Sequence, residues 1–286
     1  MTEQNGSVFH PGSAADSEDV ALPGPGGFDA HTHLDIMGLP VDGVLDAARA
    51  LGISRVVNVG CDLGSSHWSA NTADDYEMVW AAVAIHPNES FNVTAVAPGN
   101  SMKSVLGEIE TLTRRPRVVA IGETGLDYYR DYAPHDLQQA YFRGHIEIAR
   151  RAGKALMIHD RDAHEDVLSI LEEYAPWPPY SVLFHCFSGD AAMAERCAAA
   201  GYVMSFAGNV TFKNAAALRE AARVTPAALM LAETDAPYMT PVPHRGKPNS
   251  PAMTAHTIRY LAALKNLDLA EFCAQLQETG RRVFAW

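Results

Sequence analysis

The sequence predicts an α/β protein that folds as a single-domain (β/α)8 TIM barrel. After residue 26, eight short apolar runs alternate with stretches of helical length. Strands that alternate with helices indicate parallel βα units, and strands that are apolar throughout indicate burial on both faces of the sheet. The length of 286 residues fits one such barrel or two smaller domains, so length alone does not decide. An open doubly wound sheet is the alternative fold.

Each predicted strand is a short run rich in apolar residues, followed by a polar turn. The runs span residues 27–33, 55–60, 79–85, 117–123, 154–159, 181–186, 201–207 and 228–234. Between them, apolar residues recur at helical spacing. The clearest predicted helices cover 41–52, 101–115, 136–153, 162–175 and 190–201. Several of these stretches end on a glycine, which suits a helix C-terminus.

Net charge, cysteine spacing and hydropathy exclude several classes of protein. The 34 acidic and 22 basic side chains give a net charge of −12, which argues against a broad basic face for nucleic acid. The four cysteines form no CxxC pair, so we expect reduced thiols in a cytoplasmic protein. No apolar run approaches the length of a membrane span. Residues 1–26 have no signal-peptide pattern and are predicted to be a disordered tail before a domain at 27–286.

Residues that bind metals follow the predicted strands repeatedly. In a barrel of this kind the active site lies at the carboxyl ends of the strands, where residues distant in sequence meet. Four histidines and two carboxylates at such positions could hold two divalent ions. These residues are His31, His33, Glu123, His159, His185 and Asp235, and His86 follows the third strand.

The strength of this signal differs between the residues. His31 and His33 are two apart and share one face of a strand, but an HxH pair can also be a locally hydrogen-bonded turn. Glu123 at the end of an apolar strand would be costly to bury unless it is paired or binds a cation. Cys186 follows His185 directly, and strand alternation should turn it away. Surface or packing roles are expected for the other histidines, which are His10, His67, His135, His145, His164, His244 and His256.

Five motifs in this order resemble the TatD family of metal-dependent hydrolases, a branch of the amidohydrolase-like barrels. They are FDAHTHLD, GETGLDYYR, IHDRDA, HCFSG and ETDAPYMTPVPHRGKPN, and together they cover nearly the whole chain after residue 26. The chain departs from the family at Asn88, where a histidine is common. The resemblance implies two ions that share Glu123 as a bridge. One would be held by His31, His33, Glu123 and Asp235, and the other by Glu123, His159 and His185.

The resemblance also implies a deoxyribonuclease that trims single-stranded DNA from 3′ to 5′ through a metal-activated water. On this hypothesis Asp235 takes the proton of the water, His86 contacts the substrate, and Arg130 and Arg161 clamp phosphate. Each arginine could instead form an ordinary salt bridge with a loop carboxylate such as Asp127. The donors suit Mg²⁺, Mn²⁺ or Zn²⁺ without choosing among them.

Two other functions remain open at this point. The same pair of ions could hydrolyse an ester or amide, such as an aminoacyl ester on RNA, because the ligands would be identical. A catalytically weak barrel could instead bind nucleic acid or a protein partner, with metals that serve structure. The sequence does not indicate the oligomeric state.

Overall fold

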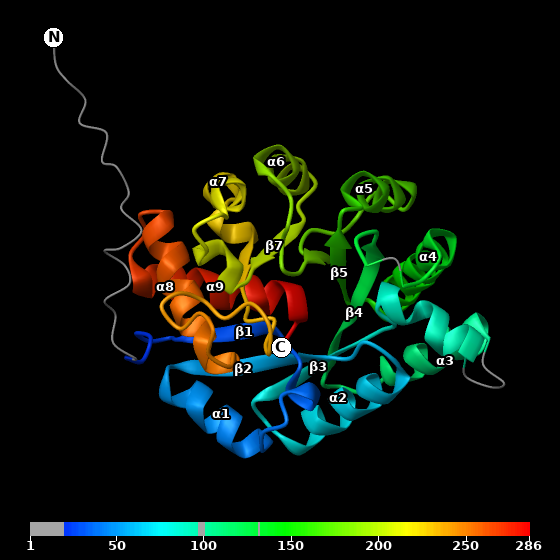
Figure 1. Cartoon of the computed structure of the whole chain (residues 1–286), viewed down its shortest axis with the longest axis horizontal. Helices are drawn as coiled ribbons and strands as arrows, with labels where there is room; N and C mark the ends of the chain where they lie inside the picture. The colour runs from blue at the N-terminus through cyan, green and yellow to red at the C-terminus, as the bar shows by residue number, and fades with distance from the viewer. Residues whose placement is uncertain (1–19, 97–100, 131) are drawn as a thin grey trace, which may run out of the picture.

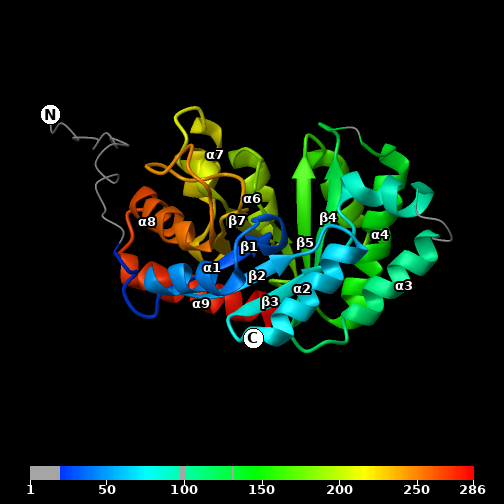
Figure 2. The ribbon, with the colours of Figure 1, turned by 60° about the horizontal axis from the view of Figure 1, so that its bottom comes forward.

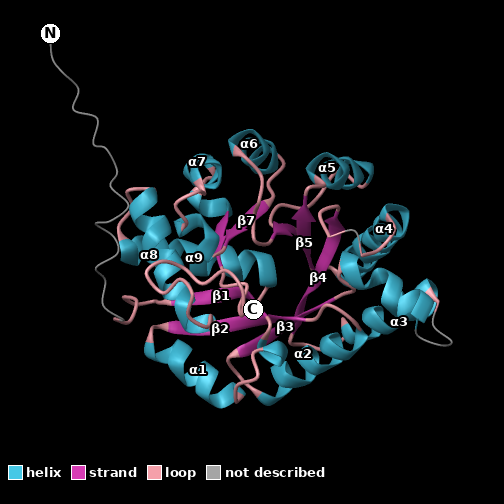
Figure 3. Cartoon of the chain, in the orientation of Figure 1, coloured by secondary structure: helices cyan, strands magenta, loops and turns pink. Residues whose placement is uncertain are grey.

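The computed structural model describes residues 20–96, 101–130 and 132–286. Eight parallel strands form one sheet in the order of the chain, from β1 to β8, and helices surround it (Figures 1 and 3). The strands are β1 (Gly27–Thr32), β2 (Ile53–Val59), β3 (Val79–Val83), β4 (Val118–Asp127), β5 (Ala155–Arg161), β6 (Val182–Phe184), β7 (Val203–Phe206) and β8 (Met230–Ala232). The predicted (β/α)8 TIM barrel is therefore confirmed.

The sheet closes between its first and last strands through the residues that follow β8. Thr32 forms a parallel bridge with Ala236, and the backbone N–H of Asp235 donates to the carbonyl of His31 at 3.0 Å. The side chain of Asp29 adds to this seam, since it accepts the backbone N–H of Thr234 at 2.8 Å. Closure therefore holds the end of β8 beside the end of β1.

Two strands extend farther than the sequence predicted. β4 continues to Asp127 because its last residues keep pairing with β5, where Gly125 is opposite His159. Gly125 has a φ of +135°, and a Cβ there would lie 2.1 Å from the carbonyl oxygen of His159, so only glycine fits. Glu123 consequently lies inside β4 and not at its end. β5 likewise continues two residues beyond His159, to Arg161.

The helices form the outer layer of the barrel (Figure 2). Local signals set several of their ends: Asp62 caps the second helix by accepting the N–H of Ser65, and Gly153 ends the fourth in the left-handed conformation. The helices are α1 (Val41–Ala50), α2 (Leu63–Asp75), α3 (Met102–Leu112), α4 (His135–Ala152), α5 (His164–Glu173), α6 (Ala191–Ala199), α7 (Ala216–Val224), α8 (Thr254–Leu264) and α9 (Leu269–Phe284). Within the described residues, none is long and apolar enough to cross a membrane.

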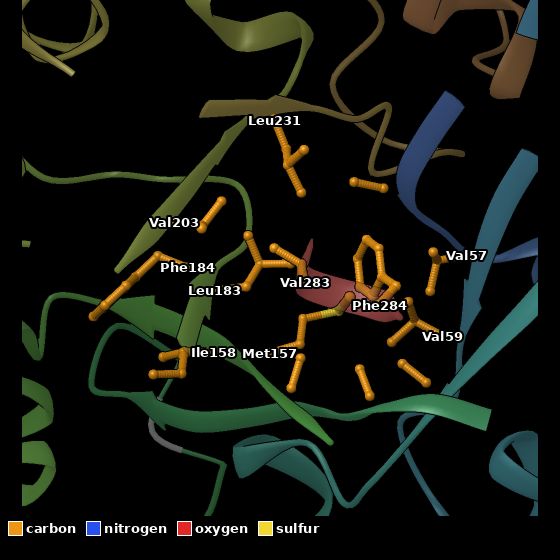
Figure 4. Packing of buried hydrophobic residues seen from close by; sticks show 14 of the residues in the cluster. Val57, Val59, Met157, Ile158, Leu183, Phe184, Val203, Leu231, Val283 and Phe284 are labelled. Carbon is orange, nitrogen blue, oxygen red and sulfur yellow. The ribbon is translucent and has the colours of Figure 1, made fainter. Parts of the chain in front are cut away.

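The core fills the barrel and its amino end. Buried side chains from the strands meet Val283 and Phe284 of α9 (Figure 4). Phe28, near the start of β1, packs edge-on against Phe284 with ring centroids 6.4 Å apart and against Trp286 at 5.1 Å. The chain end therefore covers the amino ends of the strands, and the carboxyl ends remain available for a site.

The predicted tail, residues 1–26, falls mostly outside the described residues. In its described part, Leu22 is buried, and its backbone N–H donates to the carbonyl of Leu51 at 3.0 Å. Contact with the barrel therefore begins before residue 27.

Candidate metal centre

The structure brings the predicted metal-binding residues together at the carboxyl end of the barrel. They come from β1, β4, β5, β6 and β8 or from the first three residues after these strands. A cavity of about 310 Å³ lies at this end, and its lining includes His33, Glu123, His159, His185 and Asp235. His31 is fully buried just behind it.

Glu123 lies between two pairs of histidines. Its Oε1 atom is 3.8 Å from Nε2 of His31 and 3.4 Å from Nε2 of His33. Its Oε2 atom is 2.7 Å from Nε2 of His185 and 3.3 Å from Nδ1 of His159. Each carboxylate oxygen therefore faces a different histidine pair, which is the arrangement a shared ligand requires.

Asp235 completes the group of donors on the side of His31 and His33. Its Oδ1 atom is 3.9 Å from Nε2 of His31 and 3.7 Å from Nε2 of His33, while those two nitrogens are 3.1 Å apart. The three residues thus present two nitrogens and one oxygen to a common point.

Outer contacts orient the imidazole rings on both sides of Glu123. Nδ1 of His33 lies 3.0 Å from the carbonyl oxygen of Val59, so Nδ1 carries a hydrogen and Nε2 is directed at Glu123 and Asp235. Nδ1 of His185 lies 3.4 Å from Oε1 of Glu233, which leaves its Nε2 for the cavity in the same way. A carboxylate or carbonyl behind a histidine is the usual support for a metal ligand.

In His159 the roles of the two ring nitrogens are exchanged, since Nε2 has the supporting carboxylate and Nδ1 is directed at Glu123. Its Nε2 atom is 3.1 Å from Oδ2 of Asp127, and its Nδ1 atom faces Glu123. The fit of these residues to divalent cations thus rests on their donor chemistry, because imidazole nitrogens and carboxylate oxygens are directed at shared points. A cation that binds there displaces the protons of the imidazole rings.

The charges in the site depend strongly on one another. Burial by itself would raise the pKa of Glu123, but the charge of His185 and the hydrogen bonds of His185 and His159 outweigh it and hold this pKa well below its ordinary value. Burial would lower the pKa of His185, but the carboxylates of Glu123 and Glu233 raise it to about 10. The buried carboxylates therefore stabilise positive charge in the cavity, such as that of protonated His185. A divalent cation would supply this positive charge in place of the proton.

The three predicted substrate-contact residues also line the cavity. Nε2 of His86 is 3.8 Å from Oε2 of Glu123, and burial lowers the pKa of His86 to about 3, so its ring is neutral. The guanidinium of Arg161 lies over the ring of Tyr129 at 4.0 Å, and that of Arg130 lies 5.9 Å from the ring of Tyr132.

Asp127 differs from its expected role as a loop carboxylate that pairs with an arginine. It is the buried last residue of β4. Its Oδ1 atom accepts the backbone N–H groups of Tyr129 and Arg130, at 3.0 and 2.9 Å. Its Oδ2 atom accepts from the side chain of Asn88 and faces His159. Among the described residues, neither Asp127 nor any other carboxylate forms a salt bridge with Arg130 or Arg161.

Sequence reasoning missed three residues that contact the candidate ligands, namely Asp127, Glu233 and Cys61. The last of these places its Sγ atom 3.3 Å from Oε1 of Glu123. Cys61 and Glu233 follow apolar strands, so the rule that selected the histidines could also have found them. Asp127 ends the part of β4 that extends beyond the predicted strand, so that rule would not have found it. Asn88, where the chain departs from the family pattern, is buried and donates to Asp127 at 3.0 Å.

The residues with expected surface or packing roles differ in where they lie, and His10 is outside the described residues. His145 is fully buried in α4, where Nδ1 lies 2.8 Å from the hydroxyl of Thr124 and Nε2 accepts the N–H of Ile85. His164 pairs with Asp160 at 2.8 Å. Cys186 was expected to turn away from the site, but together with His164 it lines a second cavity of about 290 Å³, whose lining also includes His185 and Asp235.

Comparison with known proteins agrees with this geometry. A family model described as TatD related DNase matches residues 28–285. The metal-dependent hydrolase TatD of Mycobacterium tuberculosis is 42% identical over 266 residues, which cover 90% of this chain and 97% of that protein. The metal-dependent hydrolase YabD of Bacillus subtilis is 35% identical over 259 residues, with 90% and 98% covered. The solved structure of YJJV, a TatD homologue from Escherichia coli K12, matches with a TM-score of 0.81 at 25% identity and covers 91% of this chain and 98% of that one.

Proposed function

Because the chain belongs to the TatD family of metal-dependent hydrolases, we propose that it hydrolyses phosphodiester bonds in single-stranded DNA from the 3′ end, with two divalent ions. The position of Glu123 carries this proposal, since each of its oxygens faces a separate pair of histidines. One ion would bind His31, His33, Glu123 and Asp235, and the other Glu123, His159 and His185.

Two divalent ions in such a site activate water and stabilise the charge that develops on a phosphoryl group. The residues of the chain prepare the rest of the reaction. Asp235 lines the cavity, and its side chain retains 12% of its exposure, so its carboxylate can orient the water and accept its proton. His86 and the guanidinium groups of Arg130 and Arg161 would contact the substrate, the arginines through phosphate oxygens.

The net charge of −12 does not oppose this substrate. A few nucleotides at one cavity need local positive potential, which bound ions and the two arginines supply, and not a basic face over the whole protein. The choice among Mg²⁺, Mn²⁺ and Zn²⁺ belongs to experiment, because imidazole and carboxylate donors accept each of them.

The test starts from metal-stripped protein to which Mg²⁺, Mn²⁺ or Zn²⁺ is returned. The reloaded protein should shorten an end-labelled single-stranded oligonucleotide, and Asp235→Asn should reduce the rate about 10²-fold or more. If no ion restores cleavage while an aminoacyl ester is hydrolysed, the carbonyl substrate replaces DNA. If neither compound reacts with any ion, the barrel binds metal without this catalysis.

A further inference from the structure

Aromatic side chains are unusually exposed around the candidate metal centre. The described residues include ten exposed large hydrophobic side chains, and seven of them belong to loops that follow strands. Three are tyrosines: Tyr129, Tyr132 and Tyr238 are 62%, 63% and 55% exposed. Scattered apolar residues need no explanation on a protein surface. Ile36, Tyr132 and Tyr238 line the cavity of the candidate metal centre, however, and exposed apolar residues gathered at a cavity indicate a binding surface.

The three tyrosines are interleaved with the two arginines of the cavity. Tyr132, Tyr238, Arg130 and Arg161 all line it. Tyr129 joins them through Arg161, whose guanidinium lies 4.0 Å from the centre of the tyrosine ring. In the part of the chain that the structure describes, the guanidinium of Arg161 forms no ion pair. Its charge therefore remains available for an anionic ligand.

Hydrogen bonds connect Tyr129 and Tyr238 to the candidate metal ligands. Asp127 accepts the backbone N–H of Tyr129 through Oδ1 and contacts His159 through Oδ2. On the other side of the cavity, the backbone N–H of Tyr238 donates to the carbonyl of Asp235 at 2.8 Å. The backbones of Tyr129 and Tyr238 are thus tied to opposite sides of the candidate metal centre.

We propose that Tyr129, Tyr132 and Tyr238 form a base-stacking surface that selects unpaired nucleotides next to the scissile phosphate. This inference rests on the proposed function for its account of cleavage. Aromatic rings bind the faces of bases regardless of sequence, while cations beside them bind the connecting phosphates. A duplex hides the faces of its bases within the stack, so this surface would accept single strands and frayed ends.

The test compares two phosphorothioate-linked oligonucleotides of equal length, which resist cleavage. One carries thymine at every position and the other carries abasic residues throughout. Their binding to the metal-loaded protein is followed by fluorescence anisotropy at a fixed salt concentration. We expect the thymine strand to bind about 5- to 150-fold more tightly, the factor that corresponds to stacking of one base.

Variants then assign this preference to the rings. The triple variant Tyr129→Leu, Tyr132→Leu, Tyr238→Leu should lose the preference and bind the abasic strand unchanged. The single variant Tyr129→Phe should keep the preference. Tyr180→Leu is the matched control, because Tyr180 also lies beside an arginine, Arg282 at 5.1 Å, but at the amino end of the barrel. Circular dichroism checks that the triple variant is folded.

The outcomes separate this inference from the proposed function. Equal binding of both strands by the unaltered protein would overturn the base-stacking surface, even if ordinary DNA is cleaved. A preference that survives the triple leucine variant would overturn it as well. A preference lost in that variant, in a protein that cleaves no DNA, would support the surface and reject the proposed nuclease.

Discussion

The two ends of the barrel both carry arginines over aromatic rings, but the arginines do different things. At the amino end, Arg117 lies over Trp80 at 4.2 Å and donates to the carbonyl of Val79 at 3.1 Å. Lys154 donates there to the carbonyl of Val118. At the carboxyl end, Arg161 lies over Tyr129 and forms no ion pair within the described residues. At the amino end, Arg117 and Lys154 donate hydrogen bonds to backbone carbonyl groups. At the carboxyl end, the guanidinium of Arg161 remains available to bind a ligand.

Cavity size does not distinguish these ends. A cavity of about 440 Å³ beside Arg117 and another of about 470 Å³ beside Lys154 both exceed the cavity of about 310 Å³ at the candidate metal centre. The difference is in buried charge, since only the last of these three is lined by several buried histidines and carboxylates. Buried groups that shift the pKa of one another are a better sign of function than volume.

The largest expected effect on hydrolysis comes from replacing Glu123, at the carboxyl end of the barrel. Glu123→Ala removes the carboxylate that faces both histidine pairs, and it should cost several kcal/mol of transition-state stabilisation, about 10³-fold in rate. Elemental analysis should find fewer than two ions per chain. Glu77→Ala, at the amino end, is the control and should change neither quantity. Full retention of two ions by Glu123→Ala would reject the bridging role.

His145 tests what burial does to a histidine without a carboxylate partner. Burial lowers its pKa to about 3, whereas the unfolded chain binds a proton near 6.5. Its contribution to stability is therefore fully present above pH 6.5 and is lost as the pH falls toward 3. The loss should reach about 3 kcal/mol by pH 4.5.

The measurement is the free energy of unfolding of the unaltered protein and of His145→Gln across this pH range. The variant should be less stable at pH 7, and the gap should narrow as the pH falls, because glutamine does not titrate. A gap that stays constant from pH 7 to 4.5 would contradict the shifted pKa.

Replacing Glu233, also at the carboxyl end, should have a smaller effect than replacing Glu123. It is fully buried, and its Oε1 atom faces Nδ1 of His185 and accepts the backbone N–H of Cys186 at 2.7 Å. Glu233→Gln keeps the shape but weakens the contact that orients His185, so metal affinity should fall about 10- to 100-fold. Competition with a chelator measures the affinity. Unchanged affinity would mean that packing alone orients the ring.

The smallest effects should come from a matched pair of arginine variants. Arg117→Gln should lower the free energy of unfolding by about 1 kcal/mol through lost hydrogen bonds and leave hydrolysis unchanged. Arg161→Gln should do the reverse, with unchanged stability and a KM for oligonucleotides raised about 5- to 10-fold. Urea unfolding and steady-state kinetics on both variants check the two expectations. If both variants changed stability and KM in the same way, the arginines at the two ends of the barrel would not have the different roles described above.

Much of the barrel and its centre was predictable from residue order alone. Apolar runs that alternate with helical spacing predict the eight strands, because burial on both faces leaves few polar positions within them. Histidines and carboxylates that follow such runs must meet at one end of a parallel barrel. His31, Glu123 and Asp235 could therefore be grouped although they are far apart in the sequence.

Only the tertiary structure decided which atoms of these residues face one another. No local pattern shows that β4 continues to Asp127, because that extension depends on pairing with β5 and on the close approach of Gly125 to His159. The contacts of Asp127 and Glu233 behind the histidines join residues more than 30 positions apart. Residue types along the chain determine which chemistry is available, whereas the direction of each nitrogen and oxygen depends on packing between distant segments.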